Sequence, residues 1–152
     1  MKHVFLINPV AGYENSVKKL TAAIEQHRDN YDIFIHVTTG KGEACNFTHE
    51  YIVNHPNEEI RFYSCGGDGT LGEVVNGIVG LENASVTCYP CGSGNDFVKS
   101  VGGRDRFLNL EKLFNAKNTK VDLIKVNNVY SLNVVNISLF FSHQYSYINF
   151  FH

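Results

Sequence analysis

The sequence lacks both a marked excess of one charge and a long apolar run. Thirteen basic and fifteen acidic residues give a formal net charge of -2 over 152 residues, so the concentrated positive charge of a nucleic-acid-binding protein is missing. No segment approaches the roughly 20 apolar residues of a membrane span. The apolar run 3–7 is also too short for the core of a signal peptide. We therefore expect a cytoplasmic protein with one domain and no nucleic acid partner.

Cysteine is scarce, and its spacing favours buried thiols. The four residues Cys45, Cys65, Cys88 and Cys91 lie in apolar or strand-like segments, which is typical of a reducing compartment. Cys88 and Cys91 have the C-x-x-C spacing of redox and zinc sites, but Cys88 lies inside a strand-like run. The seven histidines show no ligand spacing with cysteine or carboxylate residues. We name no metal ligand from these residues.

The two common nucleotide-binding motifs are missing. The sequence contains no G-x-x-x-x-G-K-[ST], which excludes a P-loop as a motif assignment. Residues 67–72 match G-x-G-x-x-G, but the dinucleotide fingerprint also needs an acidic residue about 20 positions further on. Residues 87–90, Thr-Cys-Tyr-Pro, offer none.

The stretch 61–78 instead predicts a strand, a glycine-rich turn and a helix. Three of the four residues 66–69 are glycines, which allow the backbone to approach a ligand closely. Thr70 and Glu73 have the spacing of a capping box, so we expect Thr70 to be the N-cap. The start of such a helix carries about half an elementary charge and free N–H donors, which suit a phosphate.

Asp68 is the residue that interrupts these glycines. A carboxylate inside a phosphate cradle would repel the ligand unless a metal ion lies between them, or unless the carboxylate takes a proton or a hydrogen bond. Asp68 is therefore the first catalytic candidate. The alternative is an aspartate that only caps the turn.

Strands alternate with helices along most of the chain. The expected strands are 2–7, 31–38, 60–64 and 84–89, and the expected helices are 16–28, 44–55, 71–79 and 108–116. This alternation predicts an α/β fold with a doubly wound, mainly parallel sheet. Ligands bind such sheets beyond the carboxyl ends of the strands. The loops 8–12, 38–44, 66–69 and 90–97 all fall at that edge, where we expect the site.

Three polar residues in these loops have open interpretations. Asn95 and Asp96 are either helix caps or nucleotide contacts, and their position at the ligand edge favours the second. Lys41 could reach a phosphate, but a single loop lysine is more often solvated, and we leave it out of the site.

Further along the chain, residues 121–126 and 129–137 predict two strands joined by a hairpin turn at Asn127-Asn128.

Four motifs, in this order, resemble the diacylglycerol kinase catalytic domain, which bacterial lipid kinases share with sphingosine and ceramide kinases. They are Asn8-Pro9-x-x-Gly12, Thr38-x-x-x-Gly42-Glu43-Ala44, Gly66-Gly67-Asp68-Gly69-Thr70-x-x-Glu73-Val74-Val75-Asn76-Gly77 and Gly92-Ser93-Gly94-Asn95-Asp96-Phe97. The resemblance covers residues 2–137. It implies the nucleotide-binding fold of NAD kinases and diacylglycerol kinases, and ATP-dependent phosphorylation of a lipid hydroxyl with Mg²⁺.

The resemblance also implies the ATP contacts. They are Asn8, Pro9, Val10, Ala11, Gly12, Thr38, Gly66, Gly67, Asp68, Gly69, Thr70, Leu71, Gly72 and Ser93. Asp68 would lie near the transferring phosphate, either in a metal-and-water network or helping to activate the hydroxyl. The expected partners are ATP and a diacylglycerol-like lipid, which the protein would reach transiently at a membrane surface. Whether the protein forms a homodimer is an open question.

The sequence departs from the family at three places. Ser93 stands where threonine is usual, Gly72 stands where asparagine is common, and the family pattern stops at Ser138. In the family a β-rich domain follows, which carries metal ligands and a general-base carboxylate in bacterial members. We expect an ATP-binding domain at 1–118, a hairpin at 119–137 that begins the β-rich domain and has no sheet to join, and an atypical, frameshifted tail at 138–152.

These departures leave two alternatives open. One is a nucleotide-binding remnant without catalysis, because the residues of the missing domain would be needed for turnover. The other is an NAD kinase-like enzyme, which shares the Gly-Gly-Asp-Gly-Thr turn.

Overall fold

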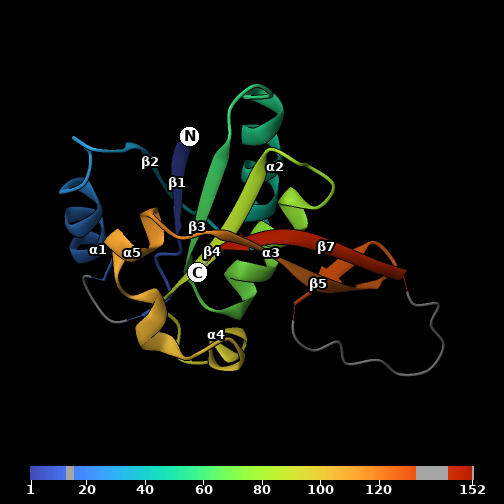
Figure 1. Ribbon diagram of the computed structural model, residues 1–152. Helices are drawn as coiled ribbons and strands as arrows, with labels where there is room; N and C mark the ends of the chain where they lie inside the picture. Colours follow the sequence, from blue (N-terminus) through green and yellow to red (C-terminus); the bar gives the residue numbers. More distant parts are fainter. Residues whose placement is uncertain (13–15, 133–143, 152) are drawn as a thin grey trace.

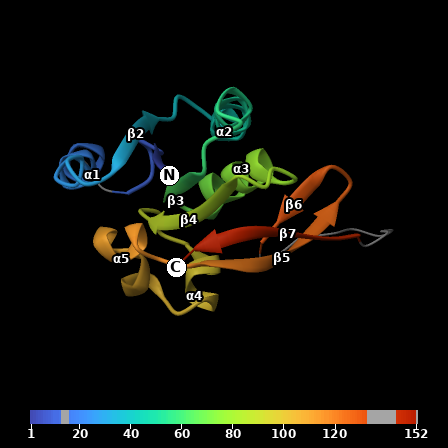
Figure 2. The ribbon, with the colours of Figure 1, turned by 45° about the horizontal axis from the view of Figure 1, so that its top comes forward.

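The computed structural model describes residues 1–12, 16–132 and 144–151 and shows an α/β protein. A twisted sheet forms its centre, with helices packed on both faces (Figure 1). The view along the sheet separates α1 and α5 from α2 and α3 (Figure 2). The predicted fold class, a doubly wound and mainly parallel sheet, is confirmed. Among the described residues, no helix is both long and apolar enough to cross a membrane.

Four parallel strands make the body of the sheet. They are β1 (Lys2–Ile7), β2 (Asp32–Val37), β3 (Ile60–Gly66) and β4 (Ala84–Pro90), in the spatial order β2-β1-β3-β4. Lys2 aligns with Asp32 on one side and with Ile60 on the other. Every residue of β3 is buried, as expected for a parallel strand that helices cover on both faces. The expected strands match these within about two residues at each end.

The helices follow the strands in alternation. They are α1 (Ser16–Glu25), α2 (Glu43–Asn54), α3 (Asp68–Ile78), α4 (Asp96–Ser100), the 3₁₀ helix η1 (Arg104–Phe107) and α5 (Leu110–Phe114). Helix α1 ends before the expected residue 28. The helix expected at 108–116 is confirmed as the shorter α5, which begins after Asn109, because the Asn109 side-chain oxygen accepts a hydrogen bond from the Lys112 amide.

Helix α3 begins earlier than its sequence predicts. Its N-cap is Gly67, and Thr70 lies inside the first turn. The Thr70 hydroxyl accepts a hydrogen bond from Asn8 at 3.0 Å, and the Glu73 carboxylate accepts one from the Gly42 amide at 2.8 Å. The predicted capping box is therefore wrong, because both side chains bind neighbouring loops and not the amides of their own helix.

One face of the sheet carries a cluster of aromatic rings, which we call the aromatic face: His3, Phe5, Tyr31, Tyr63 and Phe114. Phe5 stacks on Tyr63 and Tyr31 stacks on Phe114, each pair with its ring centroids 4.1 Å apart. His3 lies between them, with its Nδ1 2.7 Å from the Tyr63 hydroxyl. Such stacked and edge-on pairs add to the free energy gained by burial.

On the other face of the sheet, α3 presents Gly77 to α2. A Cβ atom at Gly77 would lie 2.7 Å from the Cys45 carbonyl oxygen and 2.9 Å from the Cβ of Thr48. The absence of a side chain there lets the two helix backbones approach. Helix α3, whose first residue is Asp68, is thereby fixed against its neighbour.

The C-terminal strands extend the sheet beyond β4. They are β5 (Asn118–Val126), β6 (Val129–Ser131) and β7 (Gln144–Phe151). The hairpin turn is confirmed, with Asn127 at φ 54°. Strand β7 pairs in parallel with β4 through Val86 and Phe150, and antiparallel with β5 along its length. The hairpin thus joins the main sheet through β7, contrary to our expectation that it has no sheet to join. Residues 133–143 and 152, part of the expected second strand and tail, lie outside the described residues.

Candidate nucleotide-binding site

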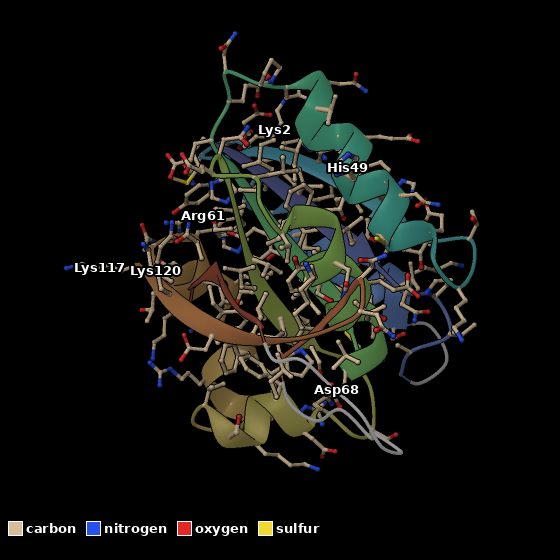
Figure 3. The ribbon with its side chains drawn as sticks, turned by 90° about the vertical axis from the view of Figure 1, so that its right-hand side faces the viewer. Lys2, His49, Arg61, Asp68, Lys117 and Lys120 are labelled. Atoms are coloured by element: carbon tan, nitrogen blue, oxygen red, sulfur yellow. The ribbon has the colours of Figure 1, made fainter. Side chains whose placement is uncertain are left out.

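A cleft of about 500 Å³, which we call the main cleft, lies at the carboxyl ends of the four parallel strands. Residues from all four expected loops line it, namely 8–11, 38–41, Gly67, Gly69, Thr70 and 92–94, together with Ala44 and Glu73. Lys2 lies at the far end of the molecule from Asp68, which marks the start of α3 beside this cleft (Figure 3). The prediction that the four loops meet at one edge of the sheet is confirmed.

Asn8 joins the first loop to helix α3. Its side-chain nitrogen donates to the Thr70 hydroxyl, its side-chain oxygen accepts from the Val10 amide at 3.1 Å, and its own amide donates to the Cys65 carbonyl at 3.0 Å. Asn8 therefore fixes the shape of its own loop and ties that loop to the turn after β3. Thr38, in the second loop, is buried, and its amide donates to the Ile7 carbonyl.

The bottom of the main cleft consists of backbone because two glycines allow no side chain there. A Cβ atom at Gly66 would lie 2.3 Å from the Thr70 hydroxyl oxygen, and one at Gly92 would lie 2.8 Å from the Cα of Gly67. The amides of Cys91 and Gly92 both donate to the Gly66 carbonyl, at 3.0 and 3.1 Å. We call this contact between the two loops the cradle. The first-turn amides of α3 lie beside it and give the cleft a positive helix end, which suits a phosphate.

Glu73 and Glu43 hold the second loop. The Glu73 carboxylate accepts from the amide of Gly42, which has φ 84° and caps α2. The Glu43 carboxylate lies 2.7 Å from His36 Nε2, and the His36 ring stacks on Phe47 with the centroids 3.9 Å apart. The loop 38–42 is thus anchored at its end by side chains from α3 and β2.

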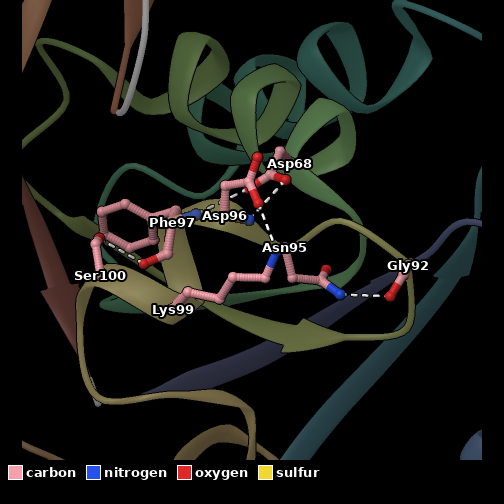
Figure 4. A network of polar contacts seen from close by, with 7 residues as sticks. All are labelled: Asp68, Gly92, Asn95, Asp96, Phe97, Lys99 and Ser100. Carbon is pink, nitrogen blue, oxygen red and sulfur yellow. Dashed lines mark hydrogen bonds and ion pairs between the residues drawn. The ribbon is translucent and has the colours of Figure 1, made fainter.

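The Asp68 carboxylate binds the start of α4 (Figure 4). Its Oδ2 accepts a hydrogen bond from the Asp96 amide at 2.9 Å, and its Oδ1 accepts one from the Phe97 amide at 3.1 Å. The carboxylate thus caps a different helix, α4, whereas the alternative drawn from the sequence is a cap of its own turn. A carboxylate has about four lone-pair positions, and Asp68 is exposed, so the two bonds leave room for a further partner. A catalytic role for Asp68 stays a prediction.

Asn95 and Asp96 shape the loop before α4. Asn95 is buried at φ 52°, and its side chain donates to the Gly92 carbonyl. The Asp96 side chain pairs with Lys99 at 2.7 Å. Asn95 stands at the N-cap position of α4 without a side-chain capping bond, and Asp96 contacts its own helix. Nucleotide contacts from both residues stay a prediction.

The structure separates the predicted ATP contacts into four groups. Nine line the main cleft: Asn8, Pro9, Val10, Ala11, Thr38, Gly67, Gly69, Thr70 and Ser93. Gly12 lines an adjoining cleft that shares Val10, Ala11 and residues 92–94 with the first. Asp68, Leu71 and Gly72 line a cleft of about 340 Å³, the small cleft, on the other side of Gly69. Gly66 lies beneath the cradle.

Sequence reasoning missed several residues of the main cleft. They are Thr39, Gly40, Lys41, Ala44, Glu73, Gly92 and Gly94. Lys41 was set aside as solvated, and it is exposed, but it follows a strand end at the cleft. The loops of Thr39, Gly40, Lys41, Gly92 and Gly94 are expected at this edge, and only these individual residues are absent from the predicted contacts.

The thiols near the cradle are poorly suited to ionise. All four cysteines are free. Burial raises the pKa of Cys88 to about 12, with the Asp68 charge adding to the effect, and burial also raises the pKa of Cys65. Burial raises the pKa of Cys91, although the Arg104 charge opposes that shift. Since the thiolate is the reactive form of cysteine, this local chemistry does not favour a thiol nucleophile.

Comparisons with known proteins agree with this geometry. The model of the diacylglycerol kinase catalytic domain matches residues 2–126. The chain belongs to this family. Diacylglycerol kinase of Bacillus subtilis (strain 168) is 30% identical over 139 residues, which cover 88% of this chain and 45% of that protein. Diacylglycerol kinase of Staphylococcus aureus (strain MRSA252) is 31% identical over 132 residues, covering 85% and 41%.

A solved structure shows the same fold. The crystal structure of a diacylglycerol kinase from Bacillus anthracis str. Sterne superimposes with a TM-score of 0.65 at 26% identity, covering 85% of this chain and 45% of that one. The chain thus spans less than half the length of the relatives it matches. The family assignment rests on the catalytic domain, and the substrate and activity of this chain are a matter of proposal.

Proposed function

We propose that this chain is the nucleotide-binding part of a lipid kinase, which transfers the γ-phosphoryl group of ATP to the hydroxyl of a diacylglycerol-like lipid. The observation that carries the proposal is the convergence of four strand-end loops on one cleft with a backbone cradle. Phosphoryl transfer depends on positioning and on stabilising negative charge more than on covalent chemistry by the protein. The first-turn amides at the start of α3, beside the cradle, suit that task.

ATP would lie in the main cleft, with its phosphates toward the first turn of α3. The residues available to hold it there are the nine predicted contacts that line the cleft, and Lys41 could pair with a phosphate. The first-turn amides of α3, at the wall of this cleft, are donors that a phosphate can use. The fit supports ATP as the donor.

Mg²⁺ would complete the site. This ion keeps several waters and is usually held by one or two carboxylates together with substrate phosphates. Asp68, exposed beside Gly69, offers the carboxylate. When bound, the ion would neutralise charge that develops on the transferring group. The hydrogen bonds that Asp68 accepts from two backbone amides would keep its carboxylate oriented.

The acceptor would approach from the small cleft. The main cleft and the small cleft share Gly69, and Asp68 lines only the small cleft. A hydroxyl there would reach the phosphate past Asp68, which could take its proton or hold the metal. A lipid acceptor would require the enzyme to work at a membrane surface.

The test combines a titration with an assay. We expect ATP with Mg²⁺ to bind the chain in calorimetry at one site. We expect phosphorylation of diacylglycerol that is presented in mixed micelles. In a parallel assay with NAD as the acceptor, we expect no phosphorylation. Asp68→Asn should lower any turnover at least a hundredfold with less than a threefold change in ATP affinity. Asp32→Asn, an exposed aspartate in β2 at the other end of the sheet, is the matched control.

Each outcome separates the alternatives. Binding without turnover would support a nucleotide site that needs residues from elsewhere for chemistry. Phosphorylation of NAD would replace the lipid kinase with an NAD kinase-like enzyme. A folded chain that binds no ATP would contradict the proposal.

A further inference from the structure

Asn76 is a polar residue in the interior of helix α3, where asparagine is not favoured by helix propensity. It is half-buried, and its side-chain amide makes three hydrogen bonds. Its Nδ2 donates to the Gly72 carbonyl at 2.7 Å and to the Tyr130 carbonyl at 2.8 Å, and its Oδ1 accepts from the Tyr130 amide at 2.8 Å. Two of the three bonds leave the helix for a residue 54 positions away.

Tyr130 belongs to β6, the last strand in the sheet order. On one side β6 pairs with β5, where Tyr130 lies opposite Lys125. On the other side its amide and carbonyl meet the Asn76 side chain. A primary amide carries the donor and acceptor of a peptide group, so Asn76 takes the place of one residue of a neighbouring strand. It satisfies backbone groups that an edge strand otherwise leaves open.

The position of Tyr130 decides the shape of the small cleft. Tyr130, Ser131 and Leu132 line that cleft together with Asp68 and Gly69 of helix α3. Asp68 and Asn76 are eight residues apart on the same helix, which is about two turns or roughly 12 Å along its axis. The same helix therefore carries the candidate catalytic carboxylate and the side chain that holds the hairpin residues of the same cleft.

We infer that Asn76 is a positioning residue that fixes the β5–β6 hairpin to helix α3 and so sets the width of the small cleft beside Asp68. The link itself rests on the hydrogen bonds alone. Its consequence for catalysis rests on the proposed function, in which the small cleft receives the acceptor hydroxyl.

The direct test is amide hydrogen exchange at Tyr130, measured by NMR. Asn76→Ala removes all three bonds. Asn76→Ser is too short to reach Tyr130, but a helical serine can still bond the carbonyl four residues back, here that of Gly72. We expect the Tyr130 amide to exchange at least tenfold faster in both variants, with the β1 and β3 amides unchanged. Asn83→Ala is the matched control, because the Asn83 side chain also donates to two backbone carbonyls, those of His55 and Glu58.

Three results would overturn the inference. They are an unchanged Tyr130 exchange rate, an increase in Asn76→Ala but not in Asn76→Ser, and an equal increase in β1 and β3. None of them depends on ATP binding or turnover, so failure of the link is distinguishable from failure of the proposed function. Where lipid phosphorylation is observed, Asn76→Ser should raise the acceptor KM at least fivefold and leave the ATP KM within twofold. Equal changes in both KM values would contradict the positioning role.

Discussion

The cradle and the aromatic face share strand β3 but are built in opposite ways. Tyr63 lies in the aromatic face and stacks on Phe5, whereas Gly66, three residues later, lies beneath the cradle and leaves no room for a Cβ atom. Buried aromatic rings stabilise the fold, and missing side chains expose backbone donors to a ligand. Stability and ligand binding should therefore respond to different substitutions in this chain.

The largest expected effect is on the aromatic face. Phe114 is 4% exposed and contacts the rings of His3, Tyr31 and Tyr63. Phe114→Ala should lower the free energy of unfolding by about 3–5 kcal/mol, because it removes a large buried ring and leaves a cavity. Urea denaturation measures this loss. Under conditions where the variant is folded, its affinity for ATP should match that of the unmodified chain.

Phe34→Ala is the matched control for this prediction. Phe34 is 41% exposed in the edge strand β2, so its loss should cost less than about 1 kcal/mol. Equal losses from the two substitutions would contradict the assignment of stability to the aromatic face.

An intermediate effect on the free energy of unfolding is expected when the pH is lowered, because His3 takes up a proton. Burial, with the Arg61 charge adding to its effect, lowers the pKa of His3 to about 4. The unfolded chain, with an ordinary histidine pKa near 6.5, then binds the proton more readily than the folded chain. The free energy of unfolding therefore keeps its full value above about pH 6.5 with respect to His3. It decreases by on the order of 2 kcal/mol as the pH falls toward 4.

The measurement is the free energy of unfolding of the unmodified chain and of His3→Gln between pH 4 and 7. Glutamine can still bond the Tyr63 hydroxyl but does not titrate. The difference between the two curves should change across this range. Parallel curves would show that His3 protonation is not linked to folding.

The smallest effect is expected at the rim of the main cleft. Glu73→Ala removes the acceptor of the Gly42 amide and frees the end of the second loop. ATP affinity should fall about fivefold, or roughly 1 kcal/mol, the usual contribution of one hydrogen bond. Glu73→Gln keeps an oxygen acceptor and should restore most of the affinity in calorimetry. If Glu73→Gln binds ATP as weakly as Glu73→Ala, the charge of Glu73 and not its hydrogen bond determines the ATP affinity.

The parallel strands and their loops could be predicted from the sequence because the signals are local. Alternating strands and helices fix the order of elements, and glycines after strands mark the loops that meet at the main cleft. Nine of the predicted ATP contacts line that cleft because they lie directly after strand ends.

The parts that could not be predicted depend on contacts between distant residues. Thr70 is not an N-cap because Asn8 binds its hydroxyl, and Glu73 binds an amide 31 positions away. Asp68 caps a helix that begins 28 residues later. The hairpin joins the sheet through residues 144–151, whose aromatic pattern has no clear period. No local pattern reports such pairings, which only the folded chain brings together.

The central claim is that four loops form one nucleotide site at the cradle, and amide NMR shifts during titration with ATP and Mg²⁺ test it most directly. We predict shifts for the amides of Val10, Lys41, Gly69 and Gly92, one from each loop, with the amides of the aromatic face unmoved. Shifts confined to the opposite end of the sheet, or none at saturating ATP, would contradict the claim.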